Sequence, residues 1–507
     1  MSDLFSWALA PFSACACSLT LGALVLILLL FLLSWRGRVK RRHGARGPFP
    51  PGPTGWPLLG NLPQLDLHHL PQELMRLSKK YGPVFSVRLG TTKVVVVSGY
   101  KTVHDALLRH GNEFCERPVY PLIENNGLNN GVLWRRGEGH RVLRRFTLTT
   151  LRNLGLGQRS IEEHIIKESS FLLQQIGHHE GEPFEPFDSL NSAVANIICS
   201  MLFGQRYEYD DEKFVQLLHL LNEDFVLLGN ASAKVYNFCP FMHYLPGSHQ
   251  KLVANVGRII KFINSKMNQH LYAESKLTPE DYIDAFLMQG AEQKNNDETL
   301  YSKGTLTLVL HDLFGSGVVT TSTTLRWALL LMVTHPEVQS KVQAEIDEVL
   351  GSCHPTMEDR ERLPYTNAVV HEVQRYANIL PLGLPRATSS DVNFLGFFIS
   401  KGTYIIPLLH AVLRDENYWT TPYDFNPSHF LNNEGTFDLP AAFLPFGAGP
   451  RLCIGEKLAR VELFIFFSTL LQNFSFEAPP GHPLPDLTPI DGLACGPKGY
   501  DLCAVRR

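Results

Sequence analysis

The spacing of hydrophobic and polar positions predicts a chain that is mostly helical. Apolar residues recur three and four positions apart in seven segments, which is the spacing of a helix with a buried face. These segments are residues 161–176, 193–203, 214–228, 252–272, 303–334, 338–350 and 368–376. Residues 303–334 form the longest segment and contain no proline, so we expect a central buried helix there.

Three shorter segments have the pattern of strands. Residues 84–98 are rich in valine on both sides of a Gly-Thr-Thr turn, which predicts a hairpin, and residues 392–399 and 404–408 are strand-like as well. No glycine-rich nucleotide-binding loop of the G-x-G-x-x-G or G-x-x-x-x-G-K-[ST] type follows a strand. The expected fold class is mainly α with small β-sheets.

The N-terminal segment predicts a membrane anchor. Residues 14–33 are almost entirely apolar, and about 20 such residues span the ~30 Å hydrocarbon core of a bilayer. Asp3 precedes them, whereas six basic residues follow: Arg36, Arg38, Lys40, Arg41, Arg42 and Arg46. This asymmetry places the N-terminus in the lumen and the rest of the chain in the cytosol. The alternative, a cleaved signal peptide, normally carries its positive charges before the apolar run.

The sequence divides into three parts. Residues 1–35 are the expected lumenal end and transmembrane anchor, residues 36–57 a basic and proline-rich linker, and residues 58–507 one large domain. A net charge of -3, with 44% hydrophobic and 19% charged residues, excludes a disordered chain and a basic nucleic-acid-binding protein. Nine cysteines are too few for a disulfide scaffold in 507 residues.

One cysteine stands in a pattern that indicates chemistry. Cys453 lies in the sequence Phe446-Gly-Ala-Gly-Pro-Arg-Leu-Cys-Ile-Gly455, directly before a predicted helix. A helix N-terminus favours a thiolate, and a single thiolate suits the axial position of a haem iron. Arg451 offers a fork for a carboxylate. An isolated cysteine is more often a small buried hydrophobe, so the surrounding glycines and arginine carry this interpretation.

The pattern F-x-x-G-x-R-x-C-x-G resembles that of the cytochromes P450, which are haem-thiolate monooxygenases. Glu372-Val-Gln-Arg375 is similar to the family's E-x-x-R motif, and His429 occupies the third place of the network that this motif forms. Residues 316–321 (SGVVTT) resemble the family's oxygen-activating helix. The resemblance covers essentially the whole chain and is closest to the animal microsomal family 2.

The resemblance implies a cytochrome P450 fold preceded by a single N-terminal transmembrane helix, and it assigns roles to individual residues. Cys453 would be the axial ligand of haem b, and Thr320 would order the group that delivers protons. The haem propionates would be held by Arg117, His140, Arg144, Arg386 and Arg451. Arg117, Arg386 and Arg451 could each instead be a solvated surface residue, Arg117 above all.

Two positions depart from the family pattern. His140 stands where the family has tryptophan in W-x-x-x-R, so a hydrogen-bond donor remains but the packing of the indole ring is lost. Val319 stands where the family has an acid before Thr320, so that partner in proton delivery is absent. We expect altered tuning of the reaction rather than loss of activity.

The expected function is a membrane-bound monooxygenase of the endoplasmic reticulum, single-pass, with a cytosolic catalytic domain. It would hydroxylate or epoxidise lipophilic substrates such as fatty acids, steroids or xenobiotics, with residues 225–228 and 380–384 as cavity wall. Electrons would come from NADPH–cytochrome P450 reductase, docked on a basic face with Arg141 and Arg145, or from cytochrome b5; no nucleic acid would bind. Two alternatives are a haem-binding protein without turnover and a reductase-independent haem-thiolate isomerase.

Overall fold

The structure is a computed structural model that describes residues 22, 47–239, 242, 244–272, 278–292 and 300–507. The predicted anchor and the basic residues after it lie outside the described residues, apart from Gly22. Within the described part of the chain, no helix is long and apolar enough to cross a membrane.

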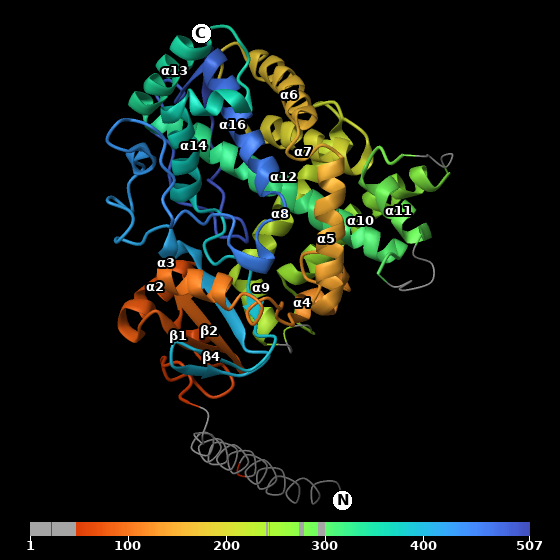
Figure 1. Ribbon diagram of the computed structural model, residues 1–507, viewed down its shortest axis with the longest axis vertical. Helices are drawn as coiled ribbons and strands as arrows, with labels where there is room; N and C mark the ends of the chain where they lie inside the picture. Colours follow the sequence, from red (N-terminus) through yellow and green to blue (C-terminus); the bar gives the residue numbers. More distant parts are fainter. Residues whose placement is uncertain (1–21, 23–46, 240–241, 243, 273–277, 293–299) are drawn as a thin grey trace, which may run out of the picture.

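The mainly helical fold predicted from the sequence is confirmed (Figure 1). The helices used below are α2 (Leu70–Tyr81), α3 (Tyr100–His104), α4 (Pro121–Glu124), α5 (Gly137–Asn153), α6 (Arg159–Gly177), α7 (Phe187–Phe203), α8 (Glu212–Gly229), α9 (Ala231–Phe238), α10 (Ser248–Tyr272), α11 (Tyr282–Glu292), α12 (Lys303–Thr334), α13 (Pro336–Leu350), α14 (Pro364–Ala377), α15 (Leu409–Val412) and α16 (Glu456–Asn473). Two short 3₁₀ helices matter for the site: η6 (Pro427–Phe430) and η7 (Gly449–Arg451).

The sheets are small, as expected. The predicted hairpin forms β1 (Val84–Leu89) and β2 (Thr92–Ser98), and it joins β6 (Tyr404–Leu408) and β3 (Arg386–Ala387) in the order β1-β2-β6-β3. Residues 392–399 form a hairpin of β4 (Val392–Phe394) and β5 (Phe397–Ile399) instead of one strand. Strands β7 (Phe474–Glu477) and β8 (Cys503–Arg506) form a third sheet near the C-terminus.

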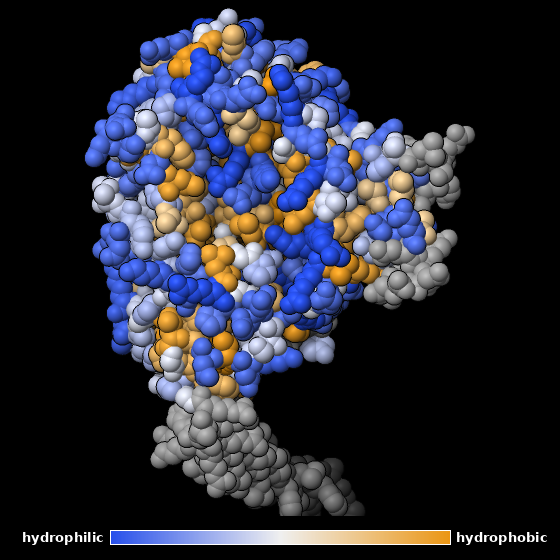
Figure 2. Space-filling model, in the orientation of Figure 1, coloured by the Kyte–Doolittle hydropathy of each residue, from blue (hydrophilic) through white to orange (hydrophobic). Residues whose placement is uncertain are grey.

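The molecule has a β-rich end and a larger helical body. In Figure 1, β1, β2 and β4 lie at the lower end of the described chain together with α2 and α3, whereas the long helices fill the rest. Figure 2 shows exposed hydrophobic residues over the β-rich end of this face, while the helical body has a mixed surface. Trp56, Leu58 and Leu59 are exposed. They lie close to β1, because the neighbouring Gly60 pairs with Leu89 at the end of that strand.

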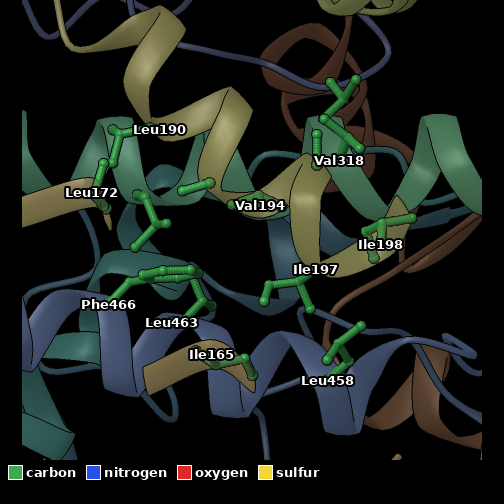
Figure 3. Packing of buried hydrophobic residues seen from close by; sticks show 14 of the residues in the cluster. Ile165, Leu172, Leu190, Val194, Ile197, Ile198, Val318, Leu458, Leu463 and Phe466 are labelled. Atoms are coloured by element: carbon green, nitrogen blue, oxygen red, sulfur yellow. The ribbon is translucent and has the colours of Figure 1, made fainter. Parts of the chain in front are cut away.

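The main hydrophobic core surrounds α12, which crosses the middle of the helical body (Figure 1). This helix packs against α7, α10, α14 and α16, and most of its residues are buried, as expected for a central helix. Figure 3 shows Ile197 of α7, Ile165 of α6 and Leu458 of α16 within this core. The core therefore fixes α12 and α16 relative to each other, and both helices carry residues of the site.

A buried ion pair connects α14 to the segment that precedes the site. Arg375 donates two hydrogen bonds to Glu372, at 2.6 and 2.7 Å, and both side chains are completely buried. The same guanidinium donates to the carbonyls of Leu413, Pro422 and Asp424. His429 of η6 lies 3.3 Å from Glu372, in the third place of this network as the sequence indicated.

Candidate active site

All the residues proposed from the sequence to bind or act on a cofactor line one cavity. This cavity has a volume of about 270 Å³ and lies between α12, the N-terminal end of α16 and the loop before it. Its lining includes Arg117, His140, Arg144, Thr320, Arg386, Arg451 and Cys453. The chain thus gathers one thiol, one histidine, four arginines and several hydroxyl groups, Thr320 among them, from segments more than 300 residues apart around a single space.

Cys453 lies between η7 and α16, with its thiol on the cavity. Its backbone N–H donates to the carbonyl of Phe446 at 3.1 Å, which closes the loop. The residue has accessible surface although protein surrounds it, because that surface faces the cavity. Burial raises the pKa of the Cys453 thiol, and the N–H groups of Gly455 and Glu456 oppose this effect. Arg144 opposes it as well, but burial is the largest cause, so the pKa of this thiol is raised and not lowered as the sequence suggested.

Glycines shape the cavity next to the cysteine. Gly447 and Gly449 have positive φ angles of 71° and 72°, which a residue with a side chain rarely adopts. A Cβ on Gly449 would also lie 1.9 Å from the carbonyl oxygen of Leu107. At Gly447 and Gly455 a Cβ would meet no atom within 4 Å, so these glycines leave open space for a flat ligand.

Four buried or half-buried arginines face the same cavity from four different segments. Backbone carbonyls position them: Arg117 donates to Leu133, Leu384 and Pro385, Arg144 to Leu452, Arg386 to Ala448, and Arg451 to Cys115, Leu133 and Arg135. Among the described residues none of the four forms an ion pair with a carboxylate. The alternative that Arg117 lies on the surface is wrong, because only 5% of it is exposed.

The positive charges of these arginines act on one another. Burial and the charges of its neighbours lower the pKa of Arg386 and of Arg451 to about 10, so both remain charged at neutral pH. Burial also lowers the pKa of Arg117, with Arg451 and Arg386 as the next causes. The Nη1 atom of Arg386 is buried and has no hydrogen-bond partner among the described residues. Such a cluster fits a ligand that carries two carboxylates.

His140 is neutral at this position. Burial and the nearby charges of Arg451 and Arg144 lower its pKa to about 3. Its ring lines both the cavity and a groove of about 330 Å³ on the other side of α5. A neutral imidazole keeps one N–H donor and adds no further positive charge to the arginine cluster.

Helix α12 presents Thr320 to the cavity but turns Val319 away from it. Thr320 Oγ1 donates to the carbonyl of Ser316 at 2.7 Å, so its lone pairs are left to accept a hydrogen bond from the cavity. Ser316 also lines the cavity and donates to the carbonyl of Asp312. Val319 is 2% exposed and packs in the main core. An acid at position 319 would therefore enter apolar surroundings.

Two acidic residues of the cavity wall, Glu462 and Asp312, were not placed there from the sequence. Glu462 of α16 lines the cavity, burial raises its pKa well above its ordinary value, and its Oε1 has no hydrogen-bond partner among the described residues. Asp312 of α12 lines the cavity too, and its Oδ2 accepts a hydrogen bond from the N–H of Leu133 at 2.8 Å. A polar residue within an apolar helical run was the available signal for both.

The segments expected to form the cavity wall divide between two cavities. Leu380 and Leu384 line the cavity of Cys453, whereas Pro381 and Leu382 line a second cavity of about 620 Å³. Gly383 lines both. Leu228 lines the second cavity, and Phe225 lines neither of them.

A helical fold with a thiol and four arginines around one cavity defines a haem-thiolate type of site. A sequence model of the family described as "Cytochrome P450" matches residues 50–504. Mouse (Mus musculus) cytochrome P450 2F2 is 43% identical over 485 residues, which are 95% of this chain and 99% of that protein. Zebrafish (Danio rerio) cytochrome P450 2K6 is 44% identical over 490 residues, 96% of this chain and 97% of that protein.

The chain belongs to the cytochrome P450 family. It is therefore a monooxygenase of the oxidoreductase class whose cofactor is haem b. The site fits that group, since it offers one sulfur ligand for iron, open space beside glycines, and unpaired arginines for two propionates.

Proposed function

We propose that this protein is an anchored monooxygenase that inserts one atom of O2 into a lipophilic substrate and reduces the other to water. Two electrons and two protons balance this reaction, and we propose that the electrons come from NADPH through cytochrome P450 reductase or cytochrome b5. The observation that carries the proposal is the cavity in which Cys453 and Thr320 meet an apolar wall that includes Ile198, Leu380 and Leu384. Bound haem would supply the oxygen chemistry.

The residues of the cavity would have three tasks. Cys453 would hold the iron through its sulfur, while the N–H groups of Gly455 and Glu456 stabilise the negative charge of that sulfur. The four arginines would hold the propionates, with His140 as an additional donor. Thr320 would accept a hydrogen bond from a water or hydroxyl group in the cavity and so keep that proton donor in place.

Thr320→Ala is expected to raise the hydrogen peroxide formed per NADPH consumed severalfold, because protons are delivered less specifically without its hydroxyl oxygen. Thr323→Ala is the matched control, since Thr323 lies on the same helix, is 4% exposed and does not line the cavity. Product, peroxide and NADPH are measured together at equal haem content. Undiminished coupling in Thr320→Ala would mean that Thr320 only packs in the helix.

The groove on the outer side of α5 supports docking of an acidic redox partner. Arg141, Arg145 and Arg152 line it, and Arg141 and Arg145 are exposed on one face of the helix. Arg144, between them, lines the cavity of Cys453 and so lies beside the cofactor. Two arginines of this region pair with carboxylates, since Arg136 lies 2.9 Å from Glu124 and Arg141 lies 3.1 Å from Glu138.

Reversing Arg141 and Arg145 to Glu is expected to raise severalfold the reductase concentration that gives half-maximal rate, because positive charges steer an acidic partner. Added salt should shrink the difference between wild type and variant. Arg76→Glu is the control, since Arg76 is exposed on α2, at the β-rich end of the molecule. Equal half-saturation at low salt in all three proteins would contradict this docking surface.

We propose the endoplasmic reticulum membrane as the location, with residues 1–35 as a single-pass anchor and residues 36–57 as a linker to the cytosolic domain formed by residues 58–507. The exposed hydrophobic residues at the β-rich end support contact of that end with lipid (Figure 2). Carbonate extraction of membranes, compared with a chain that starts at residue 47, tests the anchor. Release of both chains by carbonate would contradict it.

Oxygen consumption tests the reaction itself. Purified protein, reductase and NADPH are incubated with a panel of fatty acids, steroids and xenobiotics, and oxygen uptake and oxygenated product are measured. The proposal expects uptake and product that both require the reductase. Haem binding without oxygen uptake would favour the first alternative, a haem-binding protein without turnover. Rearrangement of a peroxide substrate in the absence of reductase would favour the second, a haem-thiolate isomerase.

A further inference from the structure

A single acidic residue interrupts the buried face of α8. The buried side chains of this helix begin with Phe214, Leu217, Leu218 and Leu221, which recur at the three- and four-residue spacing of one helical face. Asp224 occupies the next position of this face, and only 5% of it is exposed. An apolar residue is expected at such a position, because a buried carboxylate needs hydrogen bonds or a cation.

The Asp224 carboxyl lacks such partners. Both of its oxygen atoms are buried, and neither has a hydrogen-bond partner among the described residues. The neighbouring Glu223, by contrast, accepts hydrogen bonds from Lys251 and from Asn255 of α10, the latter at 2.8 Å. The hydrogen bonds of this helix contact therefore go to Glu223, which is partly exposed, and not to Asp224.

Charged groups on α8 and α12 act on the Asp224 carboxyl. Glu223 lies beside it on α8, and its negative charge disfavours a second anion there. His311 of α12 acts in the opposite direction, because a positive charge on its ring favours the anion. On α10, Lys251 and Arg258 act on Glu223.

The other two helices that pack against α8 offer Asp224 no free charge. Asp188 of α7 lies 2.9 Å from His219, and Lys234 of α9 lies 3.0 Å from Asp491. Burial is thus the largest effect on the Asp224 carboxyl and raises its pKa to about 7, although Asn255 and His311 oppose it. The carboxyl changes in the neutral range from a group that fits the buried face to an anion that does not.

Helix α8 lies next to the wall of the Cys453 cavity. Leu221 and Phe225 pack against α12 at Gly315, where a Cβ would lie 3.6 and 3.7 Å from their side chains. Ser316, the next residue of α12, lines the cavity. Any movement of α8 away from α12 therefore uncovers a segment that carries part of the cavity wall.

We propose that Asp224 is a proton-dependent lock that holds α8 against α10 and α12. The neutral carboxyl stays buried in the closed contact, whereas release of its proton to water leaves a charge that favours local opening of α8 towards solvent. Opening separates α8 from the turn of α12 that carries Ser316. Small ligands therefore reach the cavity of Cys453 more readily at higher pH.

Hydrogen–deuterium exchange of the haem-loaded full chain in lipid nanodiscs tests the lock. Exchange of the α8 amides is followed by mass spectrometry at about pH 6 and about pH 8, with correction for the intrinsic effect of pH on amide exchange. The closed contact binds the proton more tightly than the open one, so opening becomes more favourable as the pH rises. We expect corrected exchange of α8 to be severalfold and at most about 10-fold faster at the higher pH in the wild type. Equal corrected exchange at the two pH values would overturn the proposal.

The variants identify the titrating group. Asp224→Asn is expected to give equal corrected exchange at both pH values, because an amide does not titrate in this range. Asp224→Leu, which completes the apolar face, should do the same and serves if the asparagine variant fails to fold. Asp210→Asn, at an exposed acid just before α8, is the matched control and should keep the wild-type difference. A pH difference that persists in a folded Asp224 variant would overturn the proposal, because another group would then be responsible.

Carbon monoxide tests whether the lock affects the cavity. Its rebinding to the reduced protein after flash photolysis reports access to the cavity, and carbon monoxide itself has no titratable group. We expect faster rebinding at about pH 8 than at about pH 6 in the wild type, and equal rates in Asp224→Asn. Equal rates in a wild type whose α8 exchange does depend on pH would overturn the proposed effect on the cavity.

Discussion

Cys453→Ser is expected to abolish the Soret band of the ferrous–CO complex that is characteristic of thiolate ligation. An alcohol oxygen is a harder and weaker ligand for iron than a thiolate. The structure places the sulfur on the cavity and directs the N–H groups of Gly455 and Glu456 towards it. Serine at this position would keep the backbone and the cavity but would not supply the electron density that a thiolate donates.

A second cysteine provides the control for this spectrum. Cys353 is exposed, follows α13 and does not line the cavity, so Cys353→Ser should keep the complete thiolate band. Both variants are compared at equal protein concentration, with total haem measured independently by the pyridine haemochrome method. A thiolate band that survives Cys453→Ser would show that another cysteine holds the iron.

The sequence predicted the longest buried helix closely but placed the starts of the two helices that follow it too late. Helix α12 was predicted from Lys303 to Thr334, as found, because its apolar character is continuous and a proline follows. Helices α13 and α14 begin at Pro336 and Pro364, two residues and four residues before the predicted starts, since proline fits the first turn of a helix. Residues 392–399 turn at Leu395 and Gly396, and positive φ at a leucine is not expected from its side chain.

The site was predictable where a motif fixes residues in the chain, and not where packing alone brings them together. The resemblance singled out Cys453 and Thr320, and the structure places both on one cavity. The burial of Arg117 depends on segments that are distant in the sequence, so no local pattern announced it.

The ion pair between Glu372 and Arg375 can be compared with a similar pair on the surface. Glu73 and Arg76 of α2 have the same spacing of three residues and approach to 2.6 Å, but 67% of the Arg76 side chain is exposed. Glu372 and Arg375 are fully buried, and Arg375 also holds three carbonyls of the segment between β6 and η6. The two ion pairs thus have the same spacing in the sequence and the same shortest distance, and they differ in how deeply the side chains are buried.

Glu372→Ala is expected to destabilise the protein by about 3–5 kcal/mol, because it leaves the Arg375 charge buried and unpaired. Glu73→Ala should cost at most about 1 kcal/mol, since water solvates the exposed Arg76 in its place. Urea titrations followed by far-UV circular dichroism, together with thermal scans at a fixed rate, measure both variants against the wild type. We also expect a lower haem-loaded yield for Glu372→Ala, because the carbonyls that Arg375 holds belong to the segment that leads into the cysteine loop. Equal losses of stability in the two variants would contradict this expectation. They would show that each substitution weakens its helix, and that the burial of the arginine charge makes no difference.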